Sequence, residues 1–125
     1  MNKRQLITLF AALGTVVVIG ILAATVIQSV EDADAREYRI TIPQGTGALI
    51  EAGEDPNIIP NRIDLVIGER DILLIENQDT VGHRVSDFWI GAGETLRQEF
   101  SSPAVYQGQC SIHKDAQIQI VVTEG

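Results

Sequence analysis

The sequence predicts an all-β sandwich preceded by a single N-terminal transmembrane helix. Two observations carry this prediction: the stretch from Gln5 to Val30 holds no charged residue, and the remainder reads as a series of short strands separated by turns. The uncharged stretch is longer than the about 20 apolar residues that a helix needs to cross a bilayer. We therefore expect a transmembrane anchor over 1–30, a tether over 31–37 and a β domain over 38–125.

The charges on either side of the apolar stretch predict its orientation. Lys3 and Arg4 precede it, whereas all 17 acidic residues follow it. By the positive-inside bias, the N-terminus stays in the cytoplasm and the domain is translocated. A cleaved signal peptide is the alternative, because Ala33-Asp34-Ala35 has the small-x-small form of a cleavage site. Both interpretations put the domain on the extracytoplasmic side, in a periplasm or outside the cell.

Alternation of apolar residues and turn signals predicts the strands of the domain. We expect strands over 38–42, 62–67, 71–76, 81–85, 88–90, 95–100 and 117–122. The region 44–60 is rich in Gly, Pro, Asp and Glu and is expected to be loop, apart from Ala48-Leu49-Ile50. No stretch after the anchor has convincing helical periodicity. Strands spaced by about ten residues with turns between them indicate a sandwich.

Length and charge argue against several function classes. The chain has 125 residues and a net charge of −8, which leaves room for one small domain and provides no cluster of Lys and Arg for nucleic acid. Gly45-Thr46-Gly47 lacks the third glycine and the following helix of a phosphate-binding loop. No serine has the G-x-S-x-G context of a hydrolase. We expect a protein that is not an enzyme.

Two groups of side chains receive an ordinary structural interpretation. The aromatic residues of the domain are expected in the core or in the wall of a site: Phe88, Trp89, Phe100 and Tyr106. The aspartates that form no recognisable carboxylate pair are expected on a solvated surface: Asp64, Asp79, Asp87 and Asp115.

Three residues carry the chemistry: His83, Cys110 and His113 are the only histidines and the only cysteine of the chain. Cys110 and His113 lie three residues apart just before the last predicted strand, and a short loop can aim both side chains at one metal ion. His83 follows another strand, so a sandwich can bring it alongside. A thiolate with two imidazoles makes the trigonal site that suits copper in electron transfer. Structural zinc takes four protein ligands, and no obvious fourth is present.

Four motifs occur in a characteristic order along the chain. They are Asn77-Gln78-Asp79-Thr80-Val81-Gly82-His83, an N-x-D-x-x-x-H run, then Gly91-Ala92-Gly93-Glu94, then Phe100-Ser101-Ser102-Pro103-Ala104-Val105-Tyr106, and finally Cys110-Ser111-Ile112-His113. With them, the segment from Pro60 to Val122 resembles a cupredoxin, the blue-copper fold of plastocyanin and amicyanin. The resemblance implies a Greek-key β-sandwich that binds one copper ion. It also implies His83, Cys110 and His113 as equatorial ligands, with Asn77 tying the ligand-bearing loops together.

The chain departs from the cupredoxin pattern at two positions. Ala104 stands where the family usually has glycine, and the axial methionine is missing because Met1 is the only methionine. Family spacing would put the axial ligand at Ala116 or Ile118, and Gln117 lies between them. Glutamine replaces methionine in some family members, so we expect Gln117 as the axial ligand. The alternative is that Gln117 is an ordinary exposed strand residue and that the site has three ligands.

A second resemblance competes with the first. The segment from Tyr106 to Ser111 is similar to the sequence around the dinuclear copper centre of cytochrome oxidase subunit II. That centre needs a second cysteine four residues after the first, and this position is Lys114. A dinuclear site is therefore excluded by ligand count.

Together these features predict a membrane-anchored, extracytoplasmic, mononuclear copper protein that carries single electrons. The acidic domain predicts a redox partner with a basic face, such as a c-type cytochrome or an oxidase subunit. The alternative function is a copper-handling or accessory binding module of a membrane oxidase-type complex, without redox turnover.

Overall fold

A computed structural model describes residues 2–5, 7, 17, 33–112 and 117–125. The chain divides into two compact units, Met1–Ala35 and Arg36–Gly125. The anchor predicted over 1–30 lies almost wholly outside the described residues. Within the described part of the chain, no helix is both long enough and apolar enough to span a bilayer. The transmembrane anchor therefore stays a prediction.

The second unit is built of strands, and the prediction of an all-β domain is confirmed. Its elements follow the order β1 (Glu37–Ile42), α2 (Thr46–Glu51), β2 (Arg62–Val66), β3 (Ile72–Asn77), β4 (His83–Val85), β5 (Phe88–Ile90), β6 (Thr95–Glu99), β7 (Ala104–Gln109) and β8 (Gln117–Thr123). Each predicted strand is present, and most of the bounds agree within one or two residues. The strand β1 begins at Glu37, which the sequence had assigned to the tether.

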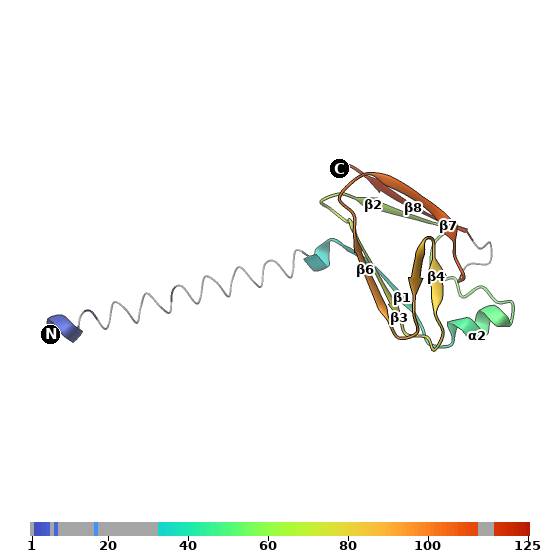
Figure 1. The fold of residues 1–125 in the computed structure, drawn as a ribbon, viewed down its shortest axis with the longest axis horizontal. Coiled ribbons are helices and arrows are strands. Elements are labelled where there is room, and N and C mark those ends of the chain that lie inside the picture. The colour runs from blue at the N-terminus through green and yellow to red at the C-terminus, as the bar shows by residue number, and fades with distance from the viewer. Residues whose placement is uncertain (1, 6, 8–16, 18–32, 113–116) are drawn as a thin grey trace. The chain divides into compact units, whose positions relative to one another are not determined.

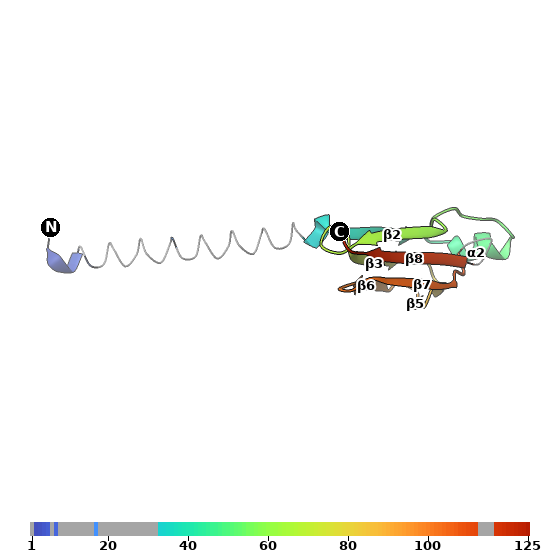
Figure 2. The ribbon, with the colours of Figure 1, turned by 90° about the horizontal axis from the view of Figure 1, so that it is seen from above.

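The strands form two three-stranded sheets and a hairpin. One sheet has the order β1-β3-β6, the other has the order β2-β8-β7, and β4 pairs with β5. The pairs β1–β3 and β2–β8 are parallel, whereas β3–β6 and β7–β8 are antiparallel. Figure 1 shows the two sheets, with the strands of one running at an angle to those of the other, and Figure 2 shows the same strands from above.

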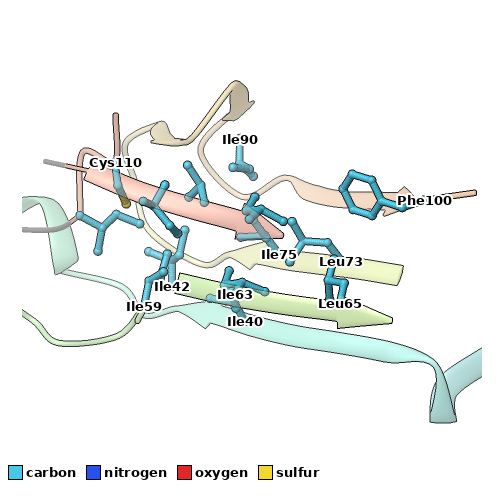
Figure 3. Packing of buried hydrophobic residues seen from close by; sticks show 14 of the residues in the cluster. Ile40, Ile42, Ile59, Ile63, Leu65, Leu73, Ile75, Ile90, Phe100 and Cys110 are labelled. Atoms are coloured by element: carbon cyan, nitrogen blue, oxygen red, sulfur yellow. The ribbon is translucent and has the colours of Figure 1, made fainter. Parts of the chain in front are cut away.

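A single apolar core joins the two sheets. The inward residues of β1 and β3 belong to the same cluster as those of β2 and β8, which is what makes the domain a sandwich. In β2, for example, Ile63 and Leu65 are fully buried while Arg62 and Asp64 are exposed. Burial of each such side chain stabilises the fold by about 1.5–3 kcal/mol. Figure 3 shows this core with Cys110 at one end and Phe100 at the other.

Two elements were not predicted. The strand β7 was not predicted because it has little apolar alternation. Val105 is exposed, and Gly108, at an inward position, has no side chain. The helix α2 was not predicted because its six residues are too few to show the helical period of apolar residues. It corrects the expectation that no helix follows the anchor, and it starts after Gly45, whose φ of 89° is left-handed.

The aromatic residues separate into three that pack in or against the core and an exposed tryptophan. Phe88, Phe100 and Tyr106 contact one another with ring centroids 5.5–6.5 Å apart, which confirms their expected place in the core. Trp89 is 61% exposed, so it does not lie in the core, and its alternative place in the wall of a site stays a prediction. Its neighbour Ile90 takes the buried side of β5, and strand alternation turns Trp89 outward. The indole ring lies over Gly82, where a Cβ atom would collide with it.

Candidate metal centre

His83 begins β4 and is buried, with 3% of its surface exposed. Its position depends on Asn77, which is also buried and which ends β3. The side-chain Oδ1 of Asn77 accepts a hydrogen bond from the backbone N–H of Asp79 at 3.0 Å. Its Nδ2 donates to the carbonyl oxygens of Val81 and Gly91, both at 2.9 Å. Asn77 therefore ties the loop before His83 to the end of β5, in the manner of an Asx turn.

The imidazole of His83 contacts a buried carboxylate. Its Nε2 lies 2.8 Å from Oδ2 of Asp79, and Asp79 is only 4% exposed. The expectation that Asp79 lies on a solvated surface is therefore wrong. The N-x-D-x-x-x-H run separates Asp79 and His83 by four residues, but this spacing alone does not predict their contact, because Asn77 sets the conformation of the loop between them.

Asp79 remains ionised although it is buried. Burial alone would raise its pKa, but hydrogen bonds from His83, Gly47, Gly45 and Thr80 hold the pKa of Asp79 well below its usual range. A carboxylate without a proton can only accept hydrogen bonds. The hydrogen of the His83–Asp79 contact therefore belongs to Nε2 of the imidazole. In the neutral imidazole, the other ring nitrogen, Nδ1, then carries a lone pair, which is the form in which histidine binds a metal.

Cys110 follows β7 and is buried, with 1% of its surface exposed. An antiparallel bridge pairs it with Val85 of β4. The next residue continues this register, because the N–H of Ser111 donates to the carbonyl of Arg84 at 2.9 Å, and the N–H of Arg84 donates to Oγ of Ser111 at 2.9 Å. The hairpin β4–β5 is thus joined to the segment that holds the cysteine.

This register puts His83 and Cys110 on the same side of the backbone. Paired residues of an antiparallel ladder project their side chains to one face, and residues two apart share that face. His83 lies two residues before Val85, the partner of Cys110. Val85 and Ile112, the other residues of this face, are buried as well. Two of the predicted ligands, a thiol and an imidazole from distant parts of the sequence, therefore face the same interior region.

The remaining predicted ligands are His113 and Gln117. His113 lies outside the described residues. Gln117 is the first residue of β8, pairs with Gln109 and is exposed, whereas the next residue, Ile118, is buried. Alternation thus puts Gln117 on the outer face of the sheet. Its axial role stays a prediction, and this placement favours the alternative in which it is an ordinary strand residue.

No group of three or more His, Cys, Asp or Glu side chains within 33–112 and 117–125 could hold a metal ion. His83 and Cys110 are the members of the predicted ligand set that lie buried in this part of the chain. Thiolate and imidazole are both donor types that copper binds. Among the described residues, two side chains of the types that bind copper therefore share one face.

No family model matches the sequence, and no curated protein matches it. Among solved structures, the chain is similar to a purple cupredoxin from Nitrosopumilus maritimus, with 17% sequence identity and a TM-score of 0.43. The match covers 68% of this chain and 98% of that chain. The strand pairing and the core shared by the two sheets make this domain a β-sandwich.

Proposed function

We propose that this protein is a mononuclear copper protein that carries single electrons. The observation that carries the proposal is the shared buried face of His83 and Cys110, together with the bond that commits Nε2 of His83 to Asp79. This bond leaves Nδ1 available as a ligand atom. We assign His83, Cys110 and His113 as the metal ligands and treat Gln117 as the open question of the axial position.

Each ligand residue has a definite task in this proposal. Copper in a site with one thiolate and two imidazoles supplies reversible one-electron chemistry. Cys110 provides the thiolate, and its burial excludes water from the sulfur. His83 sits on a strand whose backbone is bonded to the cysteine segment, so the spacing of the two ligands is determined by the sheet rather than by a flexible loop. Such a scaffold resists rearrangement between the oxidation states.

The charge of the chain supports a basic partner. Seventeen acidic residues against nine basic ones would steer a redox protein with a positive face toward this domain, for example a c-type cytochrome or an oxidase subunit. This steering would weaken as the ionic strength rises, because the Debye length falls from about 10 Å at 0.1 M salt to about 3 Å at 1 M. The uncharged stretch from Gln5 to Val30 would anchor the domain at the outer side of a membrane.

A copper titration tests the proposal. The purified full-length protein should bind one equivalent of Cu(II) and develop an intense visible band from thiolate-to-copper charge transfer. Ascorbate should bleach this band, and reoxidation should restore it. Cys110→Ser should abolish the band, whereas Gln109→Ala, a change at the exposed preceding residue, should retain it.

Other outcomes would separate the alternatives. Copper binding without the band, or with a band that does not return after reduction, would contradict electron transfer and favour the copper-handling module. Equal thermal stability with and without copper would contradict both functions, because a ligand that binds the folded state must stabilise it.

A further inference from the structure

The carboxylate of Asp79 connects two loops that are far apart in the sequence. Its Oδ1 accepts hydrogen bonds from the backbone N–H groups of Gly45 at 3.0 Å and Thr80 at 2.8 Å. Its Oδ2 accepts from the N–H of Gly47 at 2.7 Å and lies 2.8 Å from Nε2 of His83. Each oxygen thus contacts one group of the Gly45–Gly47 turn, which forms the start of α2, and one group of its own loop.

We infer that Asp79 is a positioning residue, which selects the tautomer of His83 that presents Nδ1 as a ligand, and that the Gly45–Gly47 turn holds Asp79 in place for this task. The metal-related part of the inference rests on the proposed function. The part that concerns the tautomer does not, since it describes the protein without metal.

The number of donors explains why a carboxylate is required. Three backbone N–H groups and one imidazole nitrogen converge on two oxygens, and each oxygen contacts two of these groups. An asparagine at this position has one oxygen and one NH₂ group, so two of the four sites would meet a donor instead of an acceptor. If the NH₂ group faces His83, the imidazole must offer a lone pair at Nε2. Its hydrogen then moves to Nδ1 and blocks the ligand atom.

The Gly45–Gly47 turn can be altered by a substitution that leaves Asp79 itself in place. A Cβ atom on Gly47 would lie 2.6 Å from Cγ2 of Val81 and 3.2 Å from Oδ2 of Asp79. Val81 is 47% exposed and can turn away, so Gly47→Ala should be accommodated by folding. The added methyl group would nevertheless press on the oxygen that holds His83. This variant therefore tests whether the turn acts on the imidazole through Asp79.

The decisive measurement is the ¹⁵N NMR of the imidazoles in the metal-free, full-length protein. The measurement uses His113→Ala, which leaves a single histidine and is the reference protein. In this reference protein, neutral His83 should carry hydrogen on Nε2 and none on Nδ1. Asp79→Asn should move the population toward the Nδ1–H form, and Gly47→Ala should give a smaller shift in the same direction. Even if Asp79→Asn does not fold, the His83 signal of the His113→Ala protein decides which tautomer is present.

Asp71→Asn is the matched control. Asp71 is also buried, accepts a backbone N–H from Gly68 at 2.7 Å and is bonded to a basic side chain, that of Arg36. It is bonded through its carbonyl to Phe100, at the end of the core opposite Cys110. This substitution should lower stability and leave the His83 tautomer unchanged.

The copper-loaded protein gives a second readout. Loss of a carboxylate partner of a ligand histidine typically costs 10–100-fold in metal affinity, so Asp79→Asn should weaken Cu(II) binding by this factor while Asp71→Asn should not. An Nδ1–H tautomer in the reference protein, or an unchanged tautomer in Asp79→Asn, would overturn the inference. The expected tautomers in a wild-type protein that binds no copper would instead refute the proposed function and leave the positioning of His83 intact.

Discussion

The guanidinium of Arg36 holds the carboxylate of Asp71 at two points, with Nε 2.9 Å from Oδ1 and Nη2 2.7 Å from Oδ2. Asp71 is buried and immediately precedes β3, and Arg36 immediately precedes β1. The same Nη2 also donates to Glu99 at the end of β6, at 2.9 Å. One side chain therefore fastens the starts of two parallel strands and the end of a third, at the point where the second unit begins.

Removal of this ion pair should lower stability at neutral pH and have a smaller effect in acid. The hydrogen bonds from Arg36 hold the pKa of Asp71 below its usual value, against the opposing effect of burial. A lowered pKa in the folded state contributes stability above the unfolded value of about 3.9 and loses that contribution as the pH falls through the folded value. Arg36→Ala should therefore lower Tm by several degrees at pH 7, and the difference from wild type should narrow below about pH 4.

Thermal melts of both proteins between pH 7 and pH 3 test this prediction. The control is Arg62→Ala, which removes an ion pair to Asp64 whose partners are both more than half exposed. Exposed pairs contribute little, so its Tm should stay close to that of wild type. A Tm difference for Arg36→Ala that is constant over the whole pH range would contradict the explanation.

Gly108 should not tolerate a larger side chain. A Cβ atom at this position would lie 2.7 Å from Cα and 2.8 Å from the carbonyl carbon of Ser86. Both are backbone atoms, which cannot rotate away. Gly108→Ala should therefore separate β7 from the β4–β5 hairpin and reduce the free energy of unfolding by about 1–3 kcal/mol, as overpacking does.

Urea denaturation measures this loss. Gln107→Ala, at the exposed preceding position of the same strand, serves as the control and should change the free energy of unfolding by less than about 0.5 kcal/mol. If Gly108→Ala behaved like this control, the close approach of the two segments would be refuted.

Ser86 is expected to be a site where the natural residue costs stability. Its φ of 55° lies in the left-handed region, which costs a residue other than glycine about 1–2 kcal/mol. Its Oγ is buried and, among the described residues, meets no hydrogen-bond partner. Ser86→Gly should raise the free energy of unfolding by about 1 kcal/mol, because it relieves both defects and gives back part of the gain as chain entropy.

Ser86→Ala separates the two contributions, since it removes the hydroxyl and retains the strained backbone. Calorimetry should rank the glycine variant above the alanine variant. A glycine variant less stable than wild type would show that the serine has a favourable contact which outweighs its strain.

The exposed position of Gln117 predicts that its side chain does not influence the metal. If the protein binds copper as proposed, Gln117→Ala should leave the visible spectrum and the reduction potential unchanged. Gln109→Ala, at its cross-strand partner, is the matched control for an amide removed from the same outer face. A potential that shifts in Gln117→Ala alone would identify Gln117 as the axial ligand, because this ligand tunes the potential.

Local sequence patterns predicted the strands well and the site in part. Residues such as Ile63 and Leu65 alternate with charged neighbours, and this alternation reports directly which side of a strand is buried. Trp89 was misplaced because its apolar character suggested burial, whereas its place on β5 turns it outward. Asp79 was misplaced because a single aspartate does not reveal that two glycines more than 30 residues earlier will donate to it.

By itself, the sequence determined that the domain is all-β and which residues have the chemistry of a copper ligand, because periodicity and side-chain type are local properties. The tertiary structure alone decided that β1 lies parallel to β3, that His83 shares a buried face with Cys110, and that Asp79 holds the imidazole. These relationships depend on hydrogen bonds between segments far apart in the chain. Such bonds leave no periodic trace in either segment, so only the folded arrangement of the strands reveals them.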